Sequence, residues 1–106
     1  YIFTHGFVPL TYFAHGVKLS DFNDYDWGQA SWSKTPDDIR YLDLQRFKPP
    51  KTIVFGHWRA KELNERFAGK WEEVDGDIYV DKKRELIGLD TTTALSYKVG
   101  CIILED

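Results

Sequence analysis

Apolar residues recur along the chain in short runs separated by turn signals, a pattern that predicts strands. These runs lie at residues 1–4, 52–55, 78–80, 86–89 and 98–104. The run at 52–55 is apolar throughout and stops at Gly56 and His57, as expected of a strand buried on both faces. The last three runs, with turns near residues 81–83 and 93–97, predict an antiparallel meander.

Two further segments carry the signals of helices. Residues 36–47 follow a capping threonine, begin with proline and end before a pair of prolines. Residues 60–68 are good helix formers and are closed by Gly69. Residues 7–34 show no clear period and are expected to form a long irregular loop. The order of elements predicts an α/β fold in which two helices pack on a mixed sheet.

Composition and charge narrow the class of protein. The chain has 106 residues, of which 42% are hydrophobic and 29% charged, so we expect a single folded domain. Fourteen basic residues against 17 acidic ones give a net charge of −3, which argues against a non-specific nucleic-acid binder or a membrane-surface protein. The densest basic spot, residues 82–84, is flanked by acidic residues and fits a solvated turn better than a phosphate-binding patch.

The apolar segments and the chain ends give expectations about location and completeness. No run approaches the ~20 residues of a membrane span, and no segment resembles a signal peptide, so a soluble cytoplasmic protein is expected. Cys101, the single cysteine, lies in an apolar run and is expected to be a buried, inert thiol. Both ends of the chain have the pattern of strands, so residues 1–106 are expected to be a partial domain of a longer protein.

Two histidines follow apolar strands and have glycine beside them: His5 precedes Gly6, and His57 follows Gly56. Glycine lets the backbone turn sharply and approach a ligand, and both imidazoles can meet at one edge of the sheet. Neutral imidazole is a common ligand of Zn, Fe, Mn and Ni, so the pair suggests half of a metal site. The alternative is two unrelated loop histidines, because a metal site needs three or four ligands. His15 is expected to be a surface histidine.

Three motifs resemble, in order, the C-terminal half of calcineurin-like metallophosphoesterases of the bacterial phosphoprotein phosphatase type. They are THGFVP at residues 4–9, KTIVFGHW at 51–58 and LIGLDTTTALSYKVGCIILED at 86–106. The resemblance covers nearly the whole chain. It implies half of a layered metallophosphoesterase sandwich, with a mixed sheet, two helices and a C-terminal antiparallel meander.

The resemblance also implies roles for individual residues. His5 and His57 match the two histidines that bind the second metal of a dinuclear site. Asp90 and Thr91 match the closing motif, which supports the metal ligands indirectly. Thr92 stands where glycine is usual in that motif.

Two residues after the second histidine are candidates for binding substrate. Arg59 occupies a position where many related phosphoesterases have a further metal-binding histidine. Its guanidinium either clamps a substrate phosphate or pairs with Glu62 on the surface. Trp58 or Trp27 would stack a base if the parent were a dinucleoside polyphosphate hydrolase.

The motifs of the family's first half, which supply the other metal ligands and the leaving-group acid, do not occur in these 106 residues. The resemblance therefore implies that the parent is a metal-dependent phosphoesterase with two divalent ions (Mn, Fe or Zn), acting on phosphomonoesters or on phosphoserine and phosphothreonine in proteins. This chain alone is expected to be inactive without the missing N-terminal half. The alternatives are a dinucleoside polyphosphate hydrolase and a non-catalytic binding or assembly domain, whose exposed sheet edges would favour a dimer.

Overall fold

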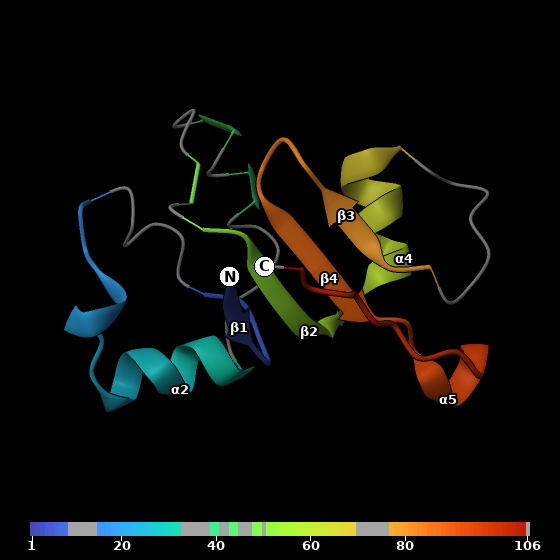
Figure 1. Cartoon of the computed structure of the whole chain (residues 1–106), viewed down its shortest axis with the longest axis horizontal. Coiled ribbons are helices and arrows are strands. Elements are labelled where there is room, and N and C mark those ends of the chain that lie inside the picture. Colours follow the sequence, from blue (N-terminus) through green and yellow to red (C-terminus); the bar gives the residue numbers. More distant parts are fainter. Residues whose placement is uncertain are drawn as a thin grey trace.

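A mixed four-stranded sheet runs through the centre of the computed structural model (Figure 1). The structure describes residues 1–8, 15–32, 39–40, 43–44, 48–49, 51–69 and 77–105. The strands are β1 (Ile2–Thr4), β2 (Ile53–Arg59), β3 (Tyr79–Asp81) and β4 (Leu86–Asp90). In space their order is β1-β2-β4-β3, with β1, β2 and β4 parallel and β3 antiparallel to β4. The predicted α/β class and the first four predicted strands are confirmed.

The helices for which the structure describes every residue are short. They are the 3-10 turn η1 (Leu19–Asp21), α2 (Asp24–Trp32), α4 (Ala60–Leu63) with its π-helical continuation η2 (Asn64–Ala68), and α5 (Thr93–Ser96). The predicted helix at 60–68 is confirmed, and it ends at Gly69 in a left-handed conformation with φ 66°. Of the helix predicted at 36–47, residues 39–40 and 43–44 are helical, and the other positions lie outside the described residues. No helix of the described ranges is long and apolar enough to cross a membrane.

Helix α2 shows that the prediction of an irregular loop over residues 7–34 is wrong in its second half. The helix begins with a capping box, because the backbone amide of Asp26 donates to Asn23 Oδ1 and the amide of Asn23 donates back to Asp26 Oδ2, at 3.0 and 3.1 Å. Its other end docks on β1: the carbonyl of Ala30 accepts hydrogen bonds from the Thr4 hydroxyl and the Gly6 amide. A helix therefore forms here because of its capping box and its contact with β1, although its apolar residues follow a helical period only weakly.

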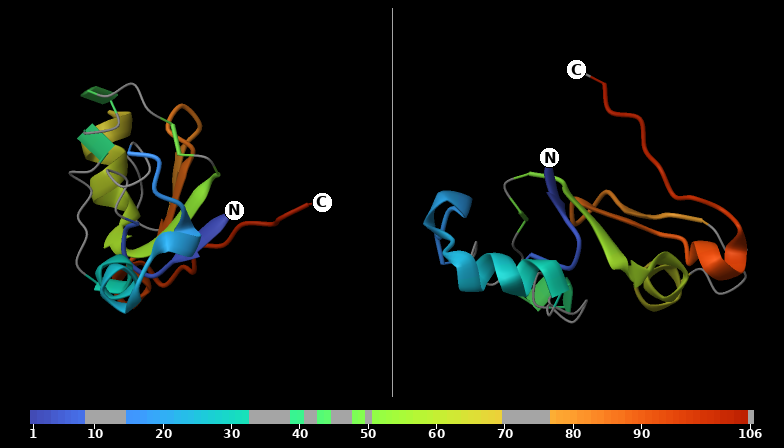
Figure 2. Two further views of the ribbon diagram at one scale, coloured as in Figure 1. Left: turned by 90° about the vertical axis from the view of Figure 1, so that its left-hand side faces the viewer. Right: turned by 90° about the horizontal axis from the view of Figure 1, so that it is seen from below.

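The last predicted strand is not formed. Residues 98–105, which we call the C-terminal tail, belong to no strand among the residues that the structure describes, and they run away from the body of the domain (Figure 2). The predicted turn at 93–97 is helix α5 instead. Cys101 is exposed, so the expectation of a buried thiol is wrong. An apolar run alone does not make a strand, because a strand needs a neighbouring strand for its backbone hydrogen bonds. Among the residues that the structure describes, no strand lies beside the C-terminal tail.

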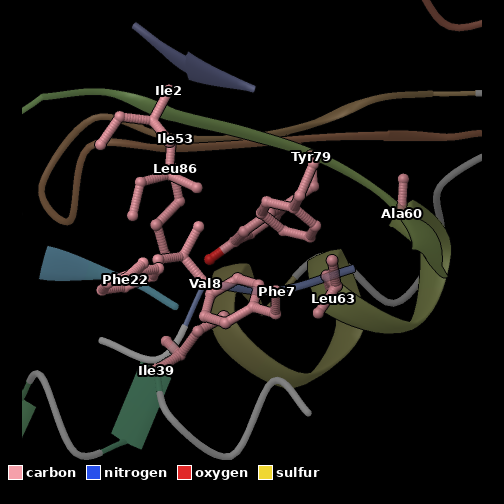
Figure 3. Close-up of a cluster of buried hydrophobic side chains, with 11 residues drawn as sticks. Ile2, Phe7, Val8, Phe22, Ile39, Ile53, Ala60, Leu63, Tyr79 and Leu86 are labelled. Carbon is pink, nitrogen blue, oxygen red and sulfur yellow. The ribbon is translucent and has the colours of Figure 1, made fainter. Parts of the chain in front are cut away.

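The core lies between the sheet and the helices on one of its faces (Figure 3). Buried side chains from all four strands meet Phe7, Val8, Ile39 and Leu63 there. Phe7 and Phe55 pack edge to face, with ring centroids 4.7 Å apart. Residues 53–55 are all buried, as predicted for a strand covered on both faces.

The basic turn before β4 is only partly solvated. Lys82 and Lys83 are exposed, as a solvated turn predicts, whereas the Arg84 side chain is only 15% exposed and bridges Asp81 and Asp43. The contact with Asp43 spans 41 positions of sequence, so the local charge pattern could not predict it.

Candidate metal centre

His5 directly follows β1, and His57 lies beside it near the carboxyl end of the parallel strand β2. The prediction that this strand stops at Gly56 and His57 is wrong, because β2 runs on to Arg59. The register pairs Thr4 with Phe55, so the chain continues from these residues at the same edge of the sheet. The amide of Gly56 donates to the carbonyl of His5 at 3.0 Å and holds the two strand ends together. The two imidazole ring centroids are 5.2 Å apart, with the ring planes inclined by 46°. Both histidines are exposed to solvent.

The backbone of His57 is in a conformation that few residues other than glycine adopt. Its φ is 60°, and it lies where the pairing of β2 with β4 shifts, between Phe55 and Arg59. Over this shift, β2 advances from Phe55 to Arg59 while its neighbour advances only from Gly88 to Asp90. Irregularities of this kind re-aim a side chain at a sheet edge, and a strained residue persists only where its surroundings hold it in place. The register shift therefore sets the direction of the His57 side chain at this edge of the sheet.

The glycines beside the histidines allow close approach of neighbouring backbone. A Cβ atom on Gly6 would lie 2.6 Å from the carbonyl oxygen of Ala30, too close without a shift of α2. A Cβ atom on Gly56 would lie 3.4 Å from the carbonyl oxygen of His5, which is a tight contact. Gly6 therefore lets α2 dock directly against the turn that carries His5. This support could not be predicted from the sequence around His5, because its local signal is the capping box of α2.

The two predicted substrate-binding residues follow His57 on β2. Trp58 is half-buried, packs against the core cluster, and meets the His57 ring edge to face with 5.4 Å between centroids. Arg59 Nη1 lies 3.6 Å from Glu62 Oε1, and both side chains are more than half exposed. Of the two predicted roles of Arg59, the structure shows the ion pair. Such an exposed pair is worth only ~0–1 kcal/mol, so an anion could displace the carboxylate.

A cavity of about 360 Å³ lies beside Arg59, at the carboxyl ends of β2 and β4. It is lined by Arg59, Lys61, Glu62, Glu65, Thr91, Thr92 and Leu95. Its two cations are balanced by its two carboxylates, so the cavity is not an anion site by charge alone. Neither histidine lines it.

Asp90 and Thr91, predicted to support the metal ligands, hold the turn after β4. Asp90 Oδ1 accepts a hydrogen bond of 2.8 Å from the amide of Thr92. Thr91 is buried, and its hydroxyl donates to the carbonyl of Lys98 at 2.6 Å. Thr92 has φ 55°, a left-handed conformation that a β-branched residue rarely adopts. The structure thus shows support of this turn, and the role of Asp90 and Thr91 toward a metal stays a prediction.

The histidine pair fits part of a metal site. Two imidazole nitrogens bound to one tetrahedral zinc at about 2.1 Å place their ring centres roughly 5 Å apart, close to the separation seen here. Within the described ranges, no third histidine, cysteine, aspartate or glutamate joins them to form a metal-binding group. The described residues therefore supply two ligands and do not complete a site.

Comparisons of the sequence with protein-family profiles and curated proteins, and of the chain with solved structures, find no match.

Proposed function

We propose that His5 and His57 are two ligands of a divalent metal ion, and that the parent of this chain is a metal-dependent phosphoesterase. The observation that carries the proposal is the 5.2 Å separation of the two rings at the ends of adjacent parallel strands. The shifted register of β2 at His57 adds to it, because irregularities of this kind re-aim a side chain at a sheet edge and are common beside active sites. The resemblance of three ordered motifs to metallophosphoesterases favours phosphate esters as the substrate.

The substrate class that we propose is a phosphomonoester, including phosphoserine or phosphothreonine in a protein. Arg59 has an exposed guanidinium two residues beyond His57, and its weak pairing with Glu62 could give way to two parallel hydrogen bonds to a phosphate. The alternative substrate, a dinucleoside polyphosphate, would need an aromatic face for its base. Trp58 packs against the core cluster and against His57, which leaves little of its ring for that purpose. Trp27 is 42% exposed and stays the candidate for this alternative.

The roles of this chain's residues are to hold and orient. The amide of Gly56 fixes the His5 carbonyl, and the shifted register of β2 fixes His57. When bound, a pair of divalent ions, Mn, Fe or Zn, would supply an activated water and neutralise charge on the phosphoryl oxygens. The remaining ligands must come from outside the described residues, in the proposal from the missing N-terminal half. By itself the chain is therefore expected to bind a metal weakly and to hydrolyse nothing.

Metal titration of the 106-residue chain tests the proposal. On adding Zn²⁺ we expect the imidazole NMR signals of His5 and His57 to shift together, and the affinity to fall at least tenfold in His5→Ala and in His57→Ala. His15→Ala is the matched control, since His15 is exposed and lies outside the sheet, and it should leave the affinity unchanged. Equal losses in all three variants, or none in the first two, would contradict a shared site.

An activity assay tests the claim that the site is incomplete. With Mn²⁺ and a generic aryl phosphate we expect no turnover above the metal alone. Turnover that His57→Ala abolishes would show that the chain completes its own site, and would confirm the phosphoesterase while correcting the ligand count. Zn²⁺ binding that does not involve His5 and His57 would instead favour the non-catalytic binding or assembly domain.

A further inference from the structure

The face of the sheet opposite the core is apolar and partly uncovered. The register aligns Phe3, Val54, Ile87 and Val80 in one row across all four strands, on the side opposite Ile53. Val54, in the middle of the row, is only 2% exposed, whereas Phe3 on β1 is 58% exposed and Val80 on β3 is 46% exposed. Tyr1 extends the row, with its ring 6.2 Å from that of Phe3. We call this row, with Tyr1, the outer face.

The C-terminal tail leaves the domain beside this face. Gly100 packs so closely on the carbonyl of Leu89 that a side chain would not fit there. The tail then stands off the sheet toward the C-terminus (Figure 2). Ile103 is 89% exposed.

Both sides of the tail are apolar. In an extended chain, Val99, Cys101 and Ile103 point to one side, and Ile102 and Leu104 to the other. Such a continuous apolar run is typical of a strand covered on both faces. The outer face of its own sheet can cover one side only, so the second side needs another apolar face.

A second copy of the chain supplies that face by symmetry. In a two-fold arrangement the same patch meets itself, so each tail would lie between its own outer face and that of its partner. The two tails then run antiparallel. A register that pairs Lys98 with Glu105 of the other copy also pairs Val99 with Leu104. A parallel arrangement would instead place the two acidic ends together.

We propose that this chain forms a two-fold symmetric dimer in which the C-terminal tails of two copies run antiparallel between the two outer faces. Pairing of the tails satisfies backbone groups that have no strand partner within the described residues. Tyr1, Phe3 and Val80 become covered together with Val99 and Ile103.

Sedimentation equilibrium of the whole chain, without metal, tests the proposal. We expect a concentration-dependent dimer, and at least a tenfold weaker association in Ile103→Asp and in Phe3→Asp. Leu44→Asp is the matched control, because Leu44 is a comparably exposed aliphatic residue outside the sheet and the tail, and it should leave the association unchanged. The far-ultraviolet circular dichroism of all variants should match that of the original chain.

A charge exchange tests the antiparallel register. Lys98→Glu places like charges opposite each other and should weaken the dimer several-fold. The double variant Lys98→Glu with Glu105→Lys should restore it. A chain that stays monomeric would overturn the proposal. This holds also if slow hydrogen exchange at 101–104 shows that the tail folds onto the sheet of its own copy. A dimer that is indifferent to Ile103→Asp, or is not restored by the exchange, would overturn it as well.

Discussion

The two ends of the parallel strands differ in how their polar groups are used. At the amino ends, the Thr52 hydroxyl donates to Glu85 and Arg84 joins Asp81 to Asp43. At the carboxyl ends, two imidazoles lie exposed, and the backbone of His57 is left-handed. The first end joins its charged side chains in hydrogen bonds, whereas the second exposes its two imidazoles. The backbone is left-handed at both ends, at Glu85 with φ 58° and at His57 with φ 60°.

The Arg84 cluster illustrates the first end. Arg84 Nη1 lies 2.5 Å from Asp81 Oδ2, and its Nη2 and Nε donate to Asp43 at 2.7 and 3.0 Å. The buried Tyr79 hydroxyl also donates to Asp81, at 2.6 Å. Burial acts to raise the pKa of Asp81, but hydrogen bonds from Tyr79 and Arg84 outweigh it and hold that pKa below its usual value. Burial and the Asp81 carboxylate together raise the pKa of Tyr79 well above its usual value.

The largest expected effect comes from breaking this cluster. Arg84→Met leaves the Asp81 carboxylate, only 9% exposed, without its cation, and should lower the free energy of unfolding by about 2–3 kcal/mol. Lys48→Met is the control: its ion pair with Glu85 is long, at 3.8 Å, and exposed, so the loss should stay below ~0.5 kcal/mol. Urea unfolding measures both values. Equal losses would show that the burial of Asp81 does not make the contribution of Arg84 larger than that of an exposed ion pair.

The same cluster makes stability depend on pH at both extremes. Because the folded pKa of Asp81 is lowered, its contribution is present above the ordinary carboxyl pKa of 3.8 and is lost as the pH falls through the folded value. Because the folded pKa of Tyr79 is raised above 10.0, its contribution is present below pH 10 and is lost as the pH rises further. Urea unfolding at pH 3, 7 and 11 measures both losses. Tyr79→Phe should remove the alkaline loss and reduce the acid loss, because it also removes a hydrogen bond that lowers the pKa of Asp81. An unchanged alkaline loss would assign that loss to other groups.

A smaller gain is expected at the carboxyl end of β4. Thr92→Gly removes the steric conflict of a β-branched residue at φ 55°, and the free energy of unfolding should rise by about 1 kcal/mol after allowing for the flexibility of glycine in the unfolded chain. Thermal and urea unfolding should agree on the sign. A loss of stability would mean that contacts of the threonine side chain outweigh the strain.

The smallest effect on stability is expected at His57 itself. His57→Gly also relieves a left-handed backbone, and the free energy of unfolding should change by less than ~1 kcal/mol. Zn²⁺ affinity should nevertheless fall at least tenfold. If the free energy of unfolding fell by several kcal/mol, His57 would stabilise the fold as Arg84 does, and the two ends of the strands would not differ in this respect.

The sheet could be predicted from local patterns because its strands are continuous apolar runs bounded by turn residues. The meeting of His5 and His57 was also predictable, since each follows such a strand and has glycine beside it. The left-handed turn at His57 was not, because it arises from the shift of β2 against β4, a property of the pair of strands. The partner of Arg84 was beyond local prediction for the same reason.

Two errors have a common physical cause. Helix α2 was missed because its support is a capping box and a docking contact, while its apolar period is weak. The tail was predicted as a strand because its composition suits one, but pairing needs a neighbour that sequence periodicity cannot supply. In both places the deciding interactions lie between elements, which a pattern along one segment does not contain.

The double hydrogen bond to the Ala30 carbonyl has a dynamic consequence. Thr4 and Gly6, which flank His5, both donate to this single oxygen of α2, so undocking of the helix would release both anchors of the loop together. Ion binding at His5 and seating of α2 should then be linked equilibria, each raising the occupancy of the other. The Gly6 amide should therefore exchange with solvent deuterium more slowly in the chain saturated with the ion than in the ion-free chain.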